Sequence, residues 1–350
     1  SDNEVQNQRS GGRGGGIYNN GILTITNCII DNNQVLNQTG SEGGGGIQNE
    51  GVSGIGPNLI TTTIIGSTLS NNKAPIGAAI RNLFGRVSVD TSIVDTNTAG
   101  TTGGGIENGA SGSMSINRSA IHDNIAPQNG GGIDNVGTMD IGSTTIYGNQ
   151  ALGCDGTSCT VGTGGAGAGV FNSGGGILNI LNTTISANSA LIGGGLYNHN
   201  EVLSTNSTLF DNSATTGGSE VYACGIKDES TTPPLTCANG ATGKDTTNNT
   251  VVTIHTKFVN TIIGDSNGNS AGGNCFGVNL TPSAGDTVDL TAFPGGIVNL
   301  INSSGHNIET ANTCGFTHFT DIRNVSPSSL FSSGLVYNGG DVTALLTYAM

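Results

Sequence analysis

Basic residues and tryptophan are what this chain has least of. It holds ten Lys and Arg against 24 Asp and Glu, no Trp, and aromatic residues make up only 4% of its 350 residues. The net charge of −14 argues against nucleic acid or an anionic membrane as a partner, because both require basic patches. The absence of Trp argues against a surface that stacks sugar rings.

Long apolar segments are also missing. No run of about 18 apolar residues occurs, so no segment is expected to span a bilayer. The chain opens at Ser1 on a polar stretch instead of a signal peptide. This start is expected of a mature secreted chain whose leader has been removed, and it predicts an extracellular or cell-surface location.

Seven cysteines form three pairs of sequence neighbours and leave Cys28 over. The spacings do not provide the Cys-x2-Cys or nearby His ligands of a zinc site, so disulfides are favoured over metal ligation. Disulfides around loops imply an oxidising, extracytoplasmic setting. Cys28 alternates with Ile30 along a strand-like run and is expected to be a buried thiol. The predicted pairs are Cys154 with Cys159, Cys224 with Cys237, and Cys275 with Cys314.

A repeated phrase dominates what is present: glycines, an aliphatic residue, any residue, then Asn. Strand-like alternation follows each copy, and a second Asn comes after it, with Ala two residues later in most repeats. Self-similarity at a short period is the signature of stacked coils. The phrase ends at Asn19, Asn49, Asn82, Asn108, Asn135, Asn172 and Asn198. The second site holds Asn33, Asn72, Asn97, Asn124, Asn149, Asn188 and Asn212.

The pattern predicts an all-β fold, a single-stranded right-handed parallel β-helix with three short strands per coil and about eight to ten coils. Stacking at about 4.8 Å places like residues on like, so each Asn set should form a hydrogen-bonded ladder. Asn also tolerates the left-handed backbone of a corner. We expect repeats over residues 1–251, with insertions at 151–168 and 223–250. Less regular coils should follow over 252–350.

Enzymatic chemistry has weak support. The best catalytic candidates are His122 and Asp123 beside Asp95, but acidic residues recur there because the repeat places polar groups at its outer edge. A solvated edge is therefore favoured, and no catalytic residue is predicted. The Gly-Gly-x-Gly-x-Asp calcium pattern is absent and the histidines lack metal spacing, so no cofactor or metal site is predicted, and a structural Ca²⁺ has no support.

The Gly-Gly-Gly-Ile-x-Asn phrase resembles the β-helix repeats of bacterial surface proteins, including polymorphic outer-membrane-protein repeats. Towards the C-terminus, Ser304-Gly305-His306-Asn307-Ile308, Asn312-Thr313-Cys314-Gly315-Phe316 and Asn338-Gly339-Gly340 resemble the ending of choice-of-anchor Q domain proteins. The resemblance implies a secreted or surface-anchored β-helix, mostly without an assigned reaction.

The expected function is structural: an extracellular or cell-surface solenoid acting as an adhesin or a self-assembling filament or matrix subunit. Unpaired strand edges at the ends of a stack favour head-to-tail self-association. A surface glycan or a receptor on a host or neighbouring cell is a further expected partner. The alternative is a β-helix that binds or cleaves polysaccharide in a lateral groove.

Overall fold

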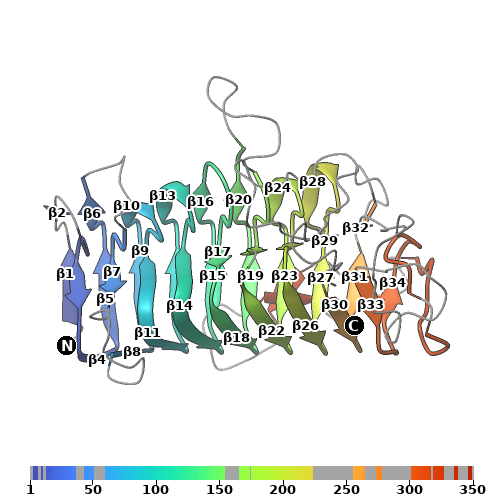
Figure 1. Ribbon diagram of the computed structural model, residues 1–350, viewed down its shortest axis with the longest axis horizontal. Coiled ribbons are helices and arrows are strands. Elements are labelled where there is room, and N and C mark those ends of the chain that lie inside the picture. Colours follow the sequence, from blue (N-terminus) through green and yellow to red (C-terminus); the bar gives the residue numbers. More distant parts are fainter. Residues whose placement is uncertain are drawn as a thin grey trace, which may run out of the picture.

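The computed structural model describes residues 3–6, 9–10, 13–36, 43–50, 60–153, 165–173, 175–223, 255–264, 273–277, 301–316, 318–326, 335–337 and 346–348. Throughout these residues the regular structure is strand, and the strands stack along one axis as a parallel β-helix (Figure 1). No helix of the described part is long and apolar enough to cross a membrane.

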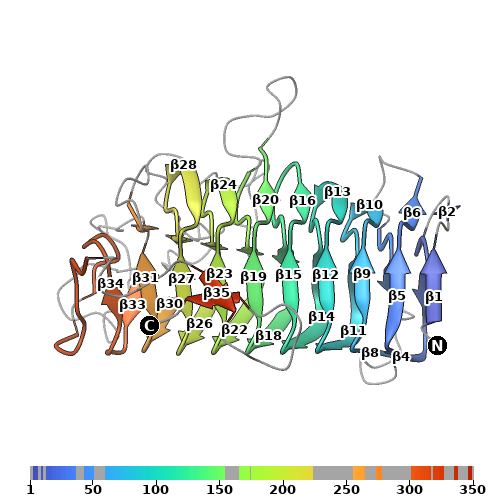
Figure 2. The same cartoon turned by 180° about the vertical axis from the view of Figure 1, so that it is seen from behind.

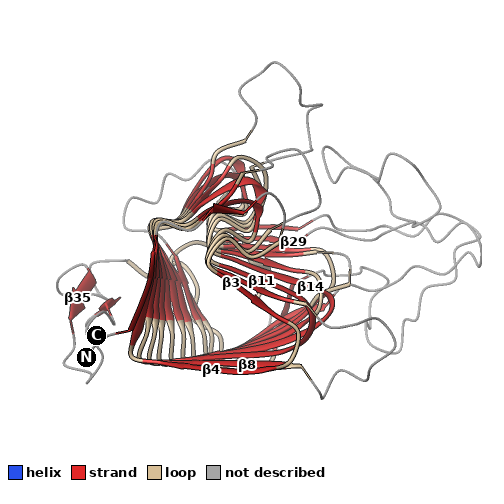
Figure 3. Cartoon of the chain, turned by 90° about the vertical axis from the view of Figure 1, so that its left-hand side faces the viewer, coloured by secondary structure: helices blue, strands red, loops and turns tan. Residues whose placement is uncertain are grey.

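Three parallel sheets run along the stack, and viewed along the axis their strands superpose (Figure 3). Sheet A contains β1 (Asn3–Gln6), β5 (Cys28–Asp31), β9 (Thr68–Ser70), β12 (Ile93–Asp95), β15 (Ala120–His122), β19 (Thr145–Tyr147), β23 (Thr184–Ser186), β27 (Thr208–Phe210), β31 (Ile262–Gly264) and β34 (Ile308–Glu309). Sheet B contains β2 (Arg9–Ser10), β6 (Gln34–Val35), β10 (Lys73–Ile76), β13 (Thr98–Thr102), β16 (Ile125–Ala126), β20 (Gln150–Ala151), β24 (Ser189–Ile192) and β28 (Ser213–Gly217).

Sheet C is built from two rows of strands that two long strands, β11 (Ile80–Asp90) and β14 (Ile106–Asn117), join into one. The row of the glycine phrase holds β3 (Ile17–Asn19), β7 (Ile47–Asn49), β17 (Ile133–Asn135), β21 (Val170–Asn172), β25 (Leu196–Asn198), β29 (Val221–Ala223) and β32 (Cys275–Gly277). The other row holds β4 (Ile22–Thr26), β8 (Thr61–Ile65), β18 (Thr138–Gly142), β22 (Ile177–Leu181), β26 (Glu201–Thr205), β30 (His255–Val259) and β33 (Ile301–Ser303). A separate antiparallel pair joins β35 (Leu335–Tyr337) to β36 (Leu346–Tyr348).

The apolar columns of the core follow the predicted register. Ile17 pairs with Ile47, and Ile106 pairs with Ile133 in the same row. Ile47, Ile106 and Ile133 are fully buried, and Ile17 packs partly buried on the same core. Each strand has only a few residues, so its stability comes from this repeated burial against the coils on either side.

Both predicted asparagine ladders are present inside the stack. In the glycine-phrase row every side-chain amide donates to the Oδ1 atom of the next Asn at 2.8–2.9 Å, from Asn19 through to Asn198. Asn198 closes the row by donating to the Thr256 hydroxyl at 2.8 Å. Buried amides need partners, and the coil above supplies them.

The second ladder is more tightly bonded. Each Asn from Asn33 to Asn188 donates both its backbone N–H and its Nδ2 to the Oδ1 atom of the next, at 2.8–3.0 Å. The last member, Asn212, points the same two donors at one carboxylate, that of the fully buried Glu220. Glu220 therefore ends the ladder, because a carboxylate has acceptor oxygens for both donors.

The expected left-handed corner is displaced by one residue. The ladder Asn itself is not left-handed; its predecessor is, with φ near 54° at Asn32, Thr96 and Ala187. The ladder Asn must keep an extended backbone so that its N–H and side chain both point at the next coil. The left-handed strain therefore falls on the residue before it, where the repeat does not conserve Asn or Gly.

Ala187→Gly should raise the free energy of unfolding by about 0.5–1 kcal/mol, because it relieves a left-handed Cβ at an exposed position. The matched control is Ala190→Gly in sheet B, which is only 5% exposed and should lose about 1 kcal/mol. Urea unfolding of both variants measures the difference. Equal losses at the two positions would contradict the strain argument.

A third ladder, formed by Ser and Thr hydroxyl groups, was not predicted from the sequence. Small hydroxyl residues immediately before six successive sheet A strands, from β9 to β27, each accept the backbone N–H of the corresponding residue in the preceding coil at 3.1–3.5 Å. Each hydroxyl donates in turn to the carbonyl two residues earlier. The signal was a Ser or Thr two residues before the central buried aliphatic residue of each of these six strands. The ladder holds Ser67, Ser92, Ser119, Thr144, Thr183 and Ser207.

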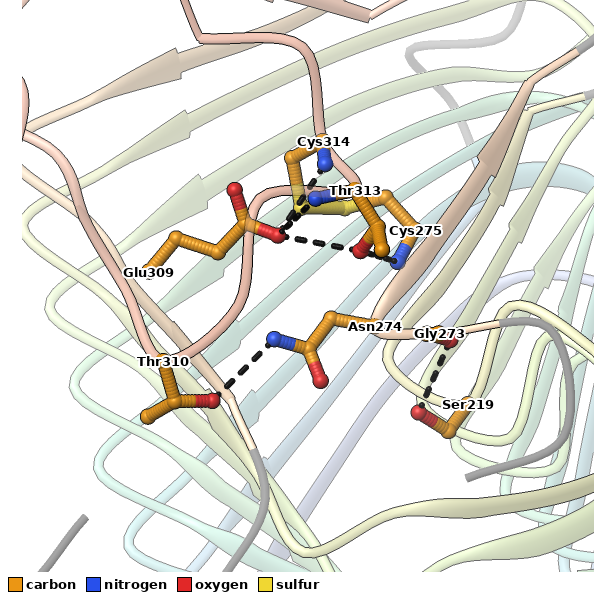
Figure 4. The surroundings of a disulfide bond; sticks show 8 residues. All are labelled: Ser219, Gly273, Asn274, Cys275, Glu309, Thr310, Thr313 and Cys314. Atoms are coloured by element: carbon orange, nitrogen blue, oxygen red, sulfur yellow. Dashed lines mark hydrogen bonds between the residues drawn. A yellow bond between two sulfur atoms is a disulfide. The ribbon is translucent and has the colours of Figure 1, made fainter. Parts of the chain in front are cut away.

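At the C-terminal end the predicted Cys275–Cys314 disulfide is formed, and it joins β32 to the closing segment (Figure 4). Glu309 accepts the backbone N–H groups of Thr313 and Cys314 beside it, at 2.7 and 3.0 Å. The neighbouring Phe316 is fully buried and packs edge-on against Phe258. These contacts fill the last turn of the core. The other two predicted disulfides, Cys154–Cys159 and Cys224–Cys237, lie outside the described residues.

At the opposite end, β1, β2, β3 and β4 each pair with one neighbour, β5, β6, β7 and β8 respectively, among the described residues. Figure 2 shows this first coil at the edge of the stack. Exposed apolar side chains lie on it, including Ile22 at 80% and Tyr18 at 43% exposure.

Candidate functional site

A polar corner follows the junction between sheets A and B, where the chain leaves one sheet for the other. Between the coils of β5 and β12 it is hollowed into a depression of about 340 Å³ lined by Asp31, Asn32, Asn71, Lys73 and Thr96. We call this hollow the corner groove. Asp31 Oδ1 accepts hydrogen bonds of 2.8 Å from the Ser70 hydroxyl and the Asn71 amide. The groove thus offers a carboxylate, an ammonium group, amides and a hydroxyl to a ligand.

The histidine cluster considered from the sequence lies further along the same corner. Asp95 pairs in register with His122, and His122 with Tyr147. His122 Nδ1 lies 2.9 Å from Asp123 Oδ2, and its ring stacks on Tyr147 with centroids 4.7 Å apart. Burial raises the pKa of Tyr147, and the charges of Asp123 and Asp95 raise it further.

The ring of His122 thus contacts one carboxylate and one aromatic ring. Within the described residues His122 is hydrogen-bonded to the Asp123 carboxylate and to no hydroxyl or thiol. The described part of the chain also holds no group of three or more His, Cys, Asp or Glu side chains that fits a metal ion. Its contacts are those of a hydrogen-bonded surface patch with one aromatic face.

A second cluster lies inside the fold, at the variable position of the glycine phrase. Arg81, Glu107 and Asp134 occupy this position in consecutive coils, paired in register through β11, β14 and β17. All three are at most 7% exposed. Arg81 Nε lies 3.2 Å from Glu107 Oε2, while no ion pair of the described residues includes Asp134.

Burial governs the protonation of both acids. It raises the pKa of Glu107 against the opposing charge and hydrogen bond of Arg81. It raises the pKa of Asp134 to about 7, the charge of Glu107 adds to that rise, and a hydrogen bond from Thr102 opposes it. Asp134 Oδ1 has no hydrogen-bond partner among the described residues. The column thus contains one positively charged arginine and two buried carboxyl groups.

In the coils that follow Asp134, the same position of the repeat is occupied by aromatic residues. Phe171, Tyr197 and Tyr222 stack face to face, with centroids 4.9 and 5.3 Å apart. The Tyr197 hydroxyl contacts His199 Nε2 at 2.9 Å, and burial strongly raises the pKa of Tyr197. These rings are at most 9% exposed, so they stabilise the stack and offer no open face to a ligand.

The asparagines predicted as structural ladder residues lie in the interior, and none of the second set exceeds 2% exposure. The charged column was missed because the sequence pattern treats its position as any residue. The available signal was that Arg81, Glu107 and Asp134 follow one another at that position in three successive copies. The predicted insertions at 151–168 and 223–250 lie for the most part outside the described residues.

Comparisons with known proteins give no identity: no family model, no curated protein and no solved structure matches this chain.

Proposed function

We propose that this protein is an extracytoplasmic structural β-solenoid that serves as an adhesin or assembly subunit at a cell surface or in a matrix. The observation that carries the proposal is the set of three continuous polar ladders inside the stack. Side chains that are fully bonded within the fold contribute cohesion and order, not chemistry. The Cys275–Cys314 disulfide favours an oxidising compartment.

Self-association, head to tail, is the mode of assembly we propose. It is supported by the one-sided pairing of β1 to β4 and of the last strands in sheets B and C among the described residues. Unpaired N–H and C=O groups at a sheet edge are a template for another strand. The exposed Ile22 and Tyr18 add apolar surface at this edge.

Sedimentation velocity over a concentration series, with electron microscopy of the concentrated sample, tests assembly. Wild-type protein should form end-to-end oligomers, and Ile22→Lys should shift them to monomers because a charge blocks the edge. Ile177→Lys, at a 39% exposed position in the middle of the stack, is the matched control and should assemble normally. Monomers at all concentrations, or equal effects of the two variants, would refute end-to-end assembly.

The second candidate is carbohydrate binding at the corner groove. It is favoured by the depression lined by Asp31, Lys73 and three amide or hydroxyl residues, which are the groups that bind sugar hydroxyls. A glycan array followed by titration calorimetry should find a ligand whose affinity falls about tenfold or more in Asp31→Ala. Lys257→Ala, at an exposed position of β30, is the control. A reducing-end assay with and without Ca²⁺ distinguishes binding from cleavage.

A further inference from the structure

The buried pair Glu107 and Asp134 joins two consecutive coils in an unusual way. Their strands, β14 and β17, are hydrogen-bonded neighbours, and Glu107 is the direct register partner of Asp134. At other levels of the column the neighbours suit each other: Arg81 meets Glu107, and Phe171 meets Tyr197. Only here, among the described levels, does a carboxyl group face a carboxyl group.

The surroundings of Asp134 supply no compensating charge. Glu107 lies on one side of it and the Phe171 ring on the other. From sheet B, Thr102 at the end of β13 reaches it with a hydrogen bond, and β13, β16 and β20 contain no ionisable residue. Arg81 is one level further away, on Glu107. Two carboxylates at these buried positions would repel each other strongly, whereas one carboxylate and one carboxylic acid would not.

We propose that Glu107 and Asp134 form a proton-dependent clasp, which holds the coils of β14 and β17 together while the pair keeps one proton and loosens them when that proton is lost. The coils of β14 and β17, in the middle of the solenoid, therefore separate more readily as the pH rises from acidic to alkaline. The opening is local, because the ladders on either side of these two levels contain no titrating group.

The direction of the pH dependence follows from the pKa of Asp134, raised from 3.8 to about 7. A carboxyl group with a raised folded pKa stabilises the fold fully below its unfolded pKa and loses that contribution as the pH rises through its folded pKa. The window is therefore about pH 4 to 7. A rise of about three pH units corresponds to a change of up to about a thousandfold in the opening equilibrium.

Hydrogen exchange with mass spectrometry at pH 5 and pH 8, corrected for intrinsic exchange rates, tests the clasp. Amides of β14 and β17 in wild-type protein should exchange up to about a hundredfold faster at pH 8 than at pH 5, while those of β5 and β27 change little. Asp134→Asn, which removes the second charge, should abolish the difference. Asp140→Asn, on the exposed face of neighbouring β18, should behave as wild type.

Three results would overturn the proposal. One is wild-type protection in β14 and β17 that does not depend on pH, and this needs no variant, so a folding failure of Asp134→Asn leaves the test intact. Another is an Asp134→Asn variant that folds and still loses protection at pH 8 to the wild-type extent. A loss spread evenly over all coils also counts against it, because that would indicate general charge repulsion in a chain of net charge −14.

Discussion

Gly104→Ala is expected to lower the free energy of unfolding by about 3 kcal/mol or more, or to prevent folding of the central coils. An added Cβ would overlap the carbonyl oxygen of Gly131 and come within 2.6 Å of the backbone of Ile125. Both neighbours are backbone atoms in the adjacent coil, which cannot turn aside as a flexible side chain would. One added methyl group would therefore push the two adjacent coils apart and disturb the hydrogen bonds between their paired strands.

The same substitution at Gly21 is the control. No heavy atom lies within 4 Å of a Cβ built there, and its φ is not in the left-handed region. Gly21→Ala should therefore be neutral or stabilise the fold by up to about 1 kcal/mol, through a smaller entropy of the unfolded chain. Chemical denaturation of the two variants decides the matter. Similar losses at Gly104 and Gly21 would show that glycine is required for chain flexibility and not for close packing.

This contrast explains why the fold could be predicted from the sequence. A coil stacked on its copy brings identical positions together, so a position that must be Gly, Ile or Asn in one coil must be so in the next. The sequence then displays each contact as a repeated letter. The asparagine ladders and the apolar columns were predictable for this reason, and so was a corner with a left-handed residue, although the structure places that residue one position earlier.

The parts that the sequence did not reveal are those where the repeat is broken. The charged column varies from Arg81 to Glu107 to Asp134, so no repeated letter marks it, and its burial depends on sheet B covering the glycine-phrase row. The corner groove depends on how two sheets meet, which a one-dimensional pattern does not contain. Glu220 was missed because a ladder's end occurs once, and a single residue cannot show a period.

Glu220→Gln is the second large effect that we expect, a loss of about 3 kcal/mol in the free energy of unfolding. The carboxylate receives both the backbone N–H and the side-chain amide of Asn212, and Gln would turn an NH₂ group towards one of these donors. A buried hydrogen bond to a charged group contributes about 1.5–3 kcal/mol, and an unsatisfied buried donor adds its desolvation cost. Each ladder Asn needs an acceptor for its two donors, and another Asn can provide it only if a further coil is present. A carboxylate accepts both donors without needing a partner beyond it, so it can end the ladder.

Glu201→Gln on the exposed face of β26 is the matched control, since it makes the same chemical change in the neighbouring coil without burial. Urea unfolding should separate the two variants by more than about 2 kcal/mol. In hydrogen exchange, Glu220→Gln should reduce amide protection first at Asn212 and Asn188, because these two residues are the last members of the ladder that Glu220 ends. A Glu220→Gln variant as stable as wild type would mean that the ladder needs no terminal acceptor, and that each Asn is held by its own coil instead of by the next.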